Sequence, residues 1–288
     1  MKSPPYANLL ALSALATLFL VGCGGPTPAA EMGRSIDAPA VYRVSAEAES
    51  RFSGPVSDLK GGTELTAAFE ARPVSGSTVE VEVLYLAANV RDAGGEPVAL
   101  NLGSLTGETV EVEMGPPGVV SEIRGSPALL EAPVPLIPLR GVITALFPPL
   151  PQEKLEIGDT WTGDIPVPFS NLSGPDQRMR FLLNSVGSSE PPEVSRIEGY
   201  ELRTEPRSFT SETAGGGVSG EGDLDVVFEG ELQPGEGYEW TERTAEFDSR
   251  FIRLPGSGYA NGSLRLEEKT RVEKLDSAEQ FGLDSGAE

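Results

Sequence analysis

Residues 42–52 read YRVSAEAESRF, and an apolar side chain stands at nearly every second position of this run. Successive side chains of a β-strand point to opposite faces, so a period of two predicts a strand with one buried and one solvated face. The same period recurs at 65–72 and 79–86, and shorter strand candidates occur at 98–102, 109–114, 119–124, 180–186, 239–252 and 264–275. The sequence therefore predicts a mainly β protein, with about a dozen antiparallel strands in an incomplete barrel or a sandwich.

One stretch has helical spacing instead. Apolar residues recur at 139, 142, 143, 146 and 147, and Pro148 and Pro149 follow directly. Side chains three and four apart share one face of a helix, and proline ends it. We predict one short central helix over 139–147.

A weak internal repeat links the two ends of this body. Residues 64–71 read ELTAAFEA and residues 223–230 read DLDVVFEG, while Tyr42 and Tyr200 precede the shared phenylalanines by 27 and 28 residues. We interpret 39–275 as a single β-rich domain, because single β domains of this length are common. Its halves, 39–125 and 197–275, would be joined by 126–196 and related by duplication. Coincidence between two strand-rich halves is the alternative.

The composition restricts the chemistry. The chain has no histidine, one cysteine, and 22 basic against 44 acidic residues, which gives a net charge of −22. Without histidine the usual general base and transition-metal ligand are missing, and one cysteine cannot form an internal disulfide or a thiolate zinc site. The negative charge argues against a nucleic acid partner. We therefore expect no enzyme, no cofactor and no metal.

The remaining acidic and glycine-rich motifs have plain structural explanations. Glu47 with Glu49 and Glu80 with Glu82 fit the solvated face of a strand. The acids at 221, 223 and 225 lack the ligand spacing of a known calcium loop. The glycine-rich run 215–220 lacks the lysine of a phosphate-binding loop, so we expect a turn there.

The N-terminus has the pattern of a targeting signal. Lys2 precedes an apolar run over 9–21, which ends in Leu20-Val21-Gly22-Cys23. The run is shorter than the ~20 apolar residues that cross a bilayer. Small residues at its end suit cleavage by a signal peptidase.

Residues 20–23 resemble the bacterial lipobox, and Cys23 is the only cysteine of the chain. The resemblance implies a lipoprotein signal peptide over 1–22 and acyl chains, palmitate among them, on Cys23. Two or three acyl chains anchor a protein stably, so we expect attachment to a membrane of the cell envelope. Gly24 replaces the Asp of inner-membrane lipoproteins, so the family's sorting rule favours the outer membrane if the source is diderm. An ordinary signal peptide with a leftover cysteine is the alternative.

Both ends of the mature chain read as loose. Residues 23–38 are rich in Gly, Pro and Ala and predict a flexible tether after the anchor. Residues 276–288 have little to bury and predict a disordered tail.

The most distinctive stretch follows the predicted helix. Residues 146–151 read LFPPLP and residues 155–161 read LEIGDTW, so stacked prolines fix an extended crossing before a turn and a strand that Trp161 opens. This pattern resembles poorly characterised bacterial lipoproteins with a duplicated β domain. The architecture as a whole resembles the LolA-like lipoprotein carriers and their mycobacterial relatives, which form an incomplete barrel around acyl chains.

These features give two hypotheses for function. In the first, a non-enzymatic lipoprotein binds or carries a lipid or other hydrophobic ligand between its sheet and the helix; the candidate ligand-binding residues are Leu139, Val142, Ile143, Leu146, Phe147 and Trp161. In the second, these residues plug a dry core, and an acidic surface binds an envelope protein partner. An enclosed apolar cavity of ~300 Å³ or more would distinguish the first from the second.

Overall fold

The computed structural model describes residues 29–31, 38–54, 58–91, 95–115, 119–151, 154–186, 195–201, 206–213, 216–233, 237–254 and 258–276. The predicted signal peptide 1–22 and Cys23 lie outside the described residues, as do most of the predicted tether 23–38 and all of the predicted tail beyond Asp276.

The described residues form sixteen strands and three short helical segments. The strands are β1 Ala29–Glu31, β2 Ala40–Ser53, β3 Asp58–Ser75, β4 Thr78–Arg91, β5 Pro97–Leu100, β6 Thr109–Gly115, β7 Val119–Gly125, β8 Lys154–Glu156, β9 Thr160–Ile165, β10 Leu172–Ser173, β11 Gln177–Val186, β12 Ser195–Glu201, β13 Arg207–Thr213, β14 Gly216–Gln233, β15 Gly237–Leu254 and β16 Gly258–Leu275. The helical segments are the 3-10 turn η1 Gly103–Leu105, α1 Pro127–Leu130 and α2 Leu139–Ala145.

Fourteen of these strands form one antiparallel sheet, with the main order β7-β6-β4-β3-β2-β16-β15-β14-β12-β11-β9. Strand β5 pairs with β4, and β13 pairs with the part of β14 that β12 leaves uncovered. The sheet curls into a nearly closed barrel with one unsealed seam. The prediction of a mainly β, antiparallel, incomplete barrel with a short helix is confirmed.

The seam lies in the middle of the chain rather than at its ends. The first and last long strands, β2 and β16, pair from Ser53 with Ser263 to Val41 with Leu275. Strands β7 and β9 stand at the two ends of the sheet and have no strand between them among the described residues. The barrel is therefore a meander that begins at β9 and continues from β16 into β2.

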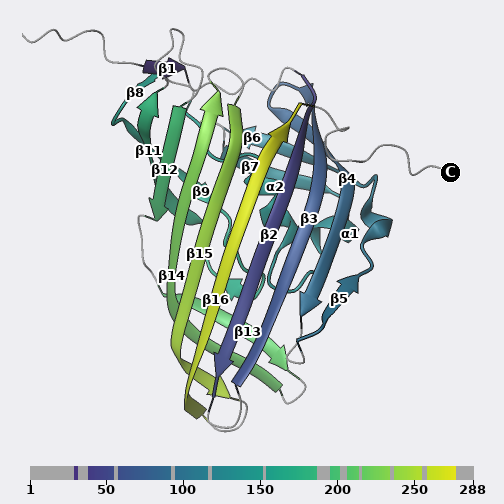
Figure 1. Cartoon of the computed structure of the whole chain (residues 1–288), viewed down its shortest axis with the longest axis vertical. Helices are drawn as coiled ribbons and strands as arrows, with labels where there is room; N and C mark the ends of the chain where they lie inside the picture. Colours follow the sequence, from purple (N-terminus) through teal and green to yellow (C-terminus); the bar gives the residue numbers. More distant parts are fainter. Residues whose placement is uncertain are drawn as a thin grey trace, which may run out of the picture.

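Apolar and polar side chains alternate along the strands, so the apolar ones line the interior of the barrel. In β2, Tyr42, Val44, Ala46 and Ala48 are buried while the residues between them face outward. The buried side chains form two apolar clusters. One joins β2, β3, β4, β6 and β7 to α1 and α2, and the other joins β9 and β11–β15 to the start of β16. Figure 1 shows the long strands β14, β15, β16, β2 and β3 side by side, with α2 behind them.

Several details differ from the sequence-based expectations. The helix ends at Ala145, two residues early, and β1 lies within the predicted tether, where it pairs with β8. The expected connection 126–196 does more than join the two halves. It contains β9, the strand expected at Trp161, and β11, which includes the strand candidate 180–186, and both belong to the barrel wall. The predicted turn at 215–220 is wrong from Gly216 onward, since this run pairs with β13 as the first part of β14.

The repeat holds for its phenylalanines but not for its tyrosines. Phe69 and Phe228 are both buried. Tyr42 is 5% exposed, whereas Tyr200 is 46% exposed. The one-residue difference in spacing turns Tyr200 to the other face of the sheet, as the strand period of two requires.

Candidate functional site

The connection between β7 and β9 fills the barrel. The Ser126 hydroxyl accepts a hydrogen bond from the Leu129 amide at 3.3 Å and so caps α1, with Pro127 at its first turn. Leu129, Val134 and Ile137 are buried in the first apolar cluster. The segment therefore crosses the interior as a plug between two parts of the wall.

Five of the six predicted ligand-binding residues lie together in this plug. Leu139, Val142, Ile143, Leu146 and Phe147 are at most 2% exposed and pack with the inward side chains of β2, β3, β4 and β6. Helical spacing put three of them on one face of α2, while its Arg140 faces outward. These residues are core residues in the structure; their role in binding a ligand stays a prediction.

Trp161 lies in the second cluster and reaches the plug through one hydrogen bond. Its indole N–H donates to the Pro149 carbonyl oxygen at 3.1 Å, and its ring stacks on Phe181 with the centroids 5.5 Å apart. Its burial and its place at the start of β9 confirm the sequence-based expectation.

Close packing at the same point depends on Gly163. A Cβ atom there would lie 2.3 Å from the Cβ of Pro149. The approach of the plug to β9 thus leaves no room for a side chain at position 163, and glycine permits it.

Sequence reasoning missed a charged pair inside the barrel. Arg243 on β15 donates from Nη2 to Oε1 of Glu268 on β16 at 2.7 Å and from Nε to Oε2 at 3.2 Å, and the Thr270 hydroxyl donates to the same carboxylate. The two charged side chains are 9% and 1% exposed. Both residues stand at inward positions of their strands, between Thr241 and Ala245 and between Leu266 and Thr270. That parity was the signal that could have revealed them.

The space next to this pair is small. A cavity of about 30 Å³ touches Phe147 and Pro148 of the plug, and also Phe228 and the Arg243 and Thr270 side chains. Ligand pockets measure roughly 300–1,000 Å³, so this cavity has the volume of about one water molecule.

A larger groove lies on the outside of the barrel, along the seam. It measures about 440 Å³ and runs between β7 and the segment that follows β9, over the outward side of α2. Its charged lining residues are Glu122, Arg140, Asp164 and Asp176. Partial burial, reinforced by the neighbouring Asp164 carboxylate, raises the pKa of Asp176 above its ordinary value of 3.8.

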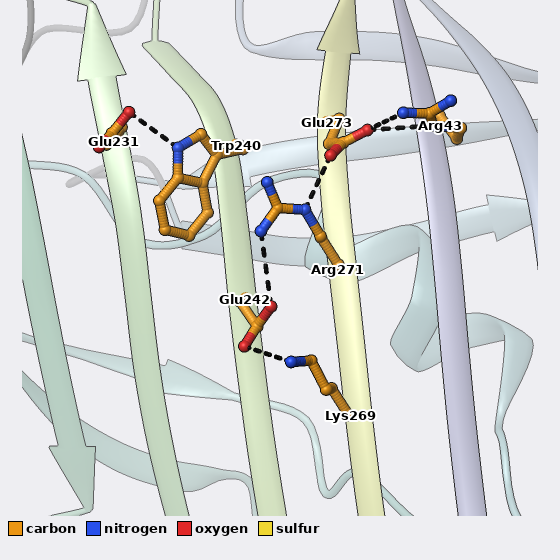
Figure 2. A network of polar contacts seen from close by, with 7 residues as sticks. All are labelled: Arg43, Glu231, Trp240, Glu242, Lys269, Arg271 and Glu273. Atoms are coloured by element: carbon orange, nitrogen blue, oxygen red, sulfur yellow. Dashed lines mark hydrogen bonds and ion pairs between the residues drawn. The ribbon is translucent and has the colours of Figure 1, made fainter.

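The outward face of the wall carries a network of charged and polar contacts (Figure 2). The Trp240 indole donates to Glu231 at 2.9 Å, and the Arg271 guanidinium lies 4.7 Å from the Trp240 ring centroid. Arg271 donates to Glu273 at 2.7 Å, and Glu273 also accepts from Arg43 of β2. Glu242 pairs with Lys269 at 2.8 Å. The network thus spans β14, β15, β16 and β2, and it links β16 to β2 across their shared edge.

A concave acidic surface lies on β13, β14 and β15. Its volume is about 830 Å³, and Glu221, Asp223, Asp225, Glu246 and Asp248 line it together with Arg250. Glu221, Asp223 and Asp225 are the acids whose spacing does not match a known calcium loop, and they occupy outward positions of β14. Within the described residues, no group of three or more acids and cysteines is arranged to hold a metal ion.

Glu47 and Glu49 also lie on the outward face, where Glu49 accepts from Arg51 at 3.0 Å. The solvated-face interpretation of this pair is confirmed. Among the residues that the structure describes, no helix is long and apolar enough to cross a membrane.

Comparisons with known proteins give only distant likenesses. No family model matches the chain, and no curated protein matches it. The chain is similar to the crystal structure of an outer membrane channel from Pseudomonas putida F1, with 9% identity and a TM-score of 0.25 over 84% of this chain and 97% of that chain. It is also similar to OccK11 (OpdR) of Pseudomonas aeruginosa, with 10% identity and a TM-score of 0.20 over 85% of this chain and 98% of that chain. The function is therefore argued from the chain's own residues.

Proposed function

We propose that this chain is a non-enzymatic lipoprotein of a bacterial cell envelope, anchored by acyl chains on Cys23, whose barrel acts by binding a protein partner. The filled interior carries the proposal. The plug takes the place that a hydrophobic ligand would occupy, and the cavity beside it measures about 30 Å³. A lipid needs about ten times that volume.

The charged pair in the interior supports the same conclusion. Arg243 and Glu268 form two hydrogen bonds with one another, so their opposite charges are compensated without a ligand headgroup. A buried ion pair is weak evidence for stability, and in some proteins it serves to specify one arrangement of the core. Here the pair joins β15 to β16 beside the plug.

The charged outer face of the barrel supports the proposal that the barrel is surrounded by water and not by lipid. Arg43, Glu242, Lys269, Arg271 and Glu273 follow one another across the wall in Figure 2. A barrel that crosses a membrane carries an apolar outward band about 25 Å tall, and charges on that band are costly. The membrane contact is then left to the acyl anchor, and the partner meets an acidic protein surface.

Native mass spectrometry of the full-length protein, followed by organic extraction, tests the proposal. Covalent acyl chains remain on Cys23, whereas a carried lipid is extracted. We expect no extractable lipid at fixed stoichiometry and no uptake of added phospholipid. Stoichiometric lipid would overturn the adaptor function.

That result would favour the second candidate, a lipid carrier in which α2 acts as a lid. One observation supports it: α2 lies across the only seam found in the described sheet, so its displacement would open the barrel. Ile143→Glu should then abolish lipid loading while much of the wall stays folded. If the variant only unfolds, the carrier loses its support.

The anchor has its own test. Cys23→Ser removes the thiol that the acyl chains need, so we expect the protein to move from the membrane fraction to the soluble fraction. Cell fractionation and immunoblotting measure this. Retention of the variant in the membrane would contradict the lipoprotein assignment.

A further inference from the structure

The direction of the strands makes the seam unusual. Ten successive antiparallel pairings lead from β7 to β9 around the wall, so these two strands run the same way. An antiparallel barrel closes only with an even number of strands, and the main path of the sheet formed by the described residues has eleven. β7 and β9 therefore cannot close the barrel as the other neighbours do.

A twelfth strand resolves the mismatch. A segment that runs opposite to β7 and β9 would pair antiparallel with whichever of the two it contacts, and with both if it fills the seam. Edge strands present rows of backbone N–H and C=O groups, and extended peptides bind to such edges. Among the described strands, β7 pairs only with β6, and β9 pairs only with β11.

The groove at the seam has room for an extended segment. It measures about 440 Å³, and its lining includes β7 residues from Val119 to Ile123 and, on the other side, Asp164 and Pro166. Gly141, which has no side chain, and the small Thr144 of α2 also line it. The plug supports this surface from inside, so an added strand would not have to displace the core.

The charge of the groove selects the occupant. The lining holds three carboxylates, of Glu122, Asp164 and Asp176, and one guanidinium, of Arg140. Outside the lining, Arg124 pairs with Glu122, and Arg178 lies 3.9 Å from Asp164. Asp164 and Asp176 repel one another, and a cation between them would relieve this. The chain's own residues 277–288 carry three acids and no base, so they are repelled from this groove.

From strand parity, groove and charge together, we propose that the seam binds an extended, basic peptide segment of a partner protein as a twelfth strand. This deepens the proposed function, on which it rests, by giving the partner's chemistry. Backbone hydrogen bonds to the edge supply affinity, and basic side chains on the outward side supply selectivity.

The test uses the full-length protein in detergent and three labelled synthetic hexapeptides. The probe is (Lys-Val)₃. One control is the same peptide with alternate amides N-methylated, which keeps the charge but removes the donors of one edge. The other is (Glu-Val)₃. Fluorescence anisotropy should show binding of (Lys-Val)₃ below ~1 mM and at least tenfold weaker binding of both controls. Amide exchange should slow at 119–125 or 160–165.

Matched variants locate the site. Thr144→Trp fills the groove and should weaken binding of (Lys-Val)₃ at least tenfold, whereas Thr244→Trp, exposed on the outward face of β15, should not change it. If Thr144→Trp fails to fold, Asp164→Lys replaces it. Asp164 is exposed, so this variant should fold, and it should bind (Lys-Val)₃ more weakly and (Glu-Val)₃ more tightly than the natural protein does.

Three results with the peptides would overturn the inference: no binding, equal binding of the N-methylated peptide, or protection at the acidic surface of β13, β14 and β15 instead of the seam. Concentration-dependent dimerisation that protects the seam would overturn it in favour of a second copy of the chain. None of these brings extractable lipid, so a failure here remains distinguishable from a failure of the proposed function.

Discussion

At the scale of single residues, the pair of Arg243 and Glu268 is the most consequential feature of the interior. Arg243→Met leaves an unpaired carboxylate that is 1% exposed as a side chain. Removing one partner of a buried pair lowers the free energy of unfolding by roughly 3–5 kcal/mol. We expect urea denaturation of Arg243→Met to show a loss of that size.

The triple variant Arg243→Met/Glu268→Leu/Thr270→Val is the control. It removes both charges and the hydroxyl that donates to Glu268, so no buried polar group is stranded. Its stability should return to within about 1–2 kcal/mol of the natural protein. A triple variant as unstable as Arg243→Met would mean that side-chain packing, and not the uncompensated charge, causes the loss.

Two carboxylates should make stability depend on pH in opposite directions. Partial burial raises the pKa of Asp176 above 3.8, so the folded state binds its proton more tightly than the unfolded chain does. Stability is then lost as pH rises through the raised pKa. Asp176→Asn mimics the protonated form, and it should raise the urea midpoint at pH 7 but leave it unchanged below about pH 3.8.

Glu273 is the counterpart with the opposite sign. Hydrogen bonds from Arg271 and then Arg43 lower its pKa below 4.5. Its contribution is present at neutral pH and is lost as pH falls through the lowered pKa. Glu273→Gln should therefore lower the urea midpoint at pH 7 and converge with the natural protein in acid. Parallel pH profiles for the two variants would contradict both assignments.

At the scale of elements, the plug depends on its contact with β9. Gly163→Ala would place a Cβ atom 2.3 Å from Pro149, so either the plug or the strand must shift. Overpacking of this kind costs about 1–3 kcal/mol. The loss should appear in urea denaturation, together with a change in Trp161 fluorescence, because Pro149 also accepts the Trp161 hydrogen bond.

Gly103→Ala is the matched change. The nearest atom to its new Cβ would be Asn101 Oδ1 at 3.9 Å, which is an ordinary contact. It should leave both stability and fluorescence nearly unchanged. Equal effects at the two glycines would show that backbone freedom, and not the clash, decides the outcome.

Strands and helices that follow from a pattern of neighbouring residues could be predicted from the sequence. Alternation over 42–52 identified β2, and helical spacing from Leu139 identified α2 with its buried face. The candidate residues followed from that spacing, and their burial is confirmed. Local pattern does not say what lies opposite a buried face, so the same residues fitted a ligand pocket and a plug equally well.

Features that depend on distant pairing could not be predicted in this way. The contact of β2 with β16 joins residues such as Val41 and Leu275, and no local signal records it. The position of the seam follows from that contact and was missed with it. Arg243 is an intermediate case. The alternation of β15 predicts that its side chain points inward, but its partner Glu268 lies 25 residues away, and no local pattern identifies it.

At the scale of the whole molecule, the order of strands predicts that the chain can be reconnected. Val41 pairs with Leu275, and directly paired antiparallel residues lie about 4.5–5.5 Å apart at Cα. A short hairpin linker can therefore join Asp276 to residue 38. New termini at the exposed Ile157, in the turn before β9, would place the chain ends beside the natural seam.

In such a permutant the chain would run from β9 to β16, through the new linker into β2, on to β7, and end with the plug and β8. The pairs between β2 and β16 are kept, but the two strands become neighbours in sequence, joined by a hairpin. Because non-local pairing slows folding, we expect faster refolding at nearly unchanged stability. Stopped-flow refolding and urea denaturation measure the two quantities. The linker also removes β1, the partner of β8. Loss of the fold in the permutant, but not in an unpermuted chain of residues 38–276, would show that the covalent passage through the turn at 157–158, and not the pairing of β2 with β16, holds the plug in the barrel.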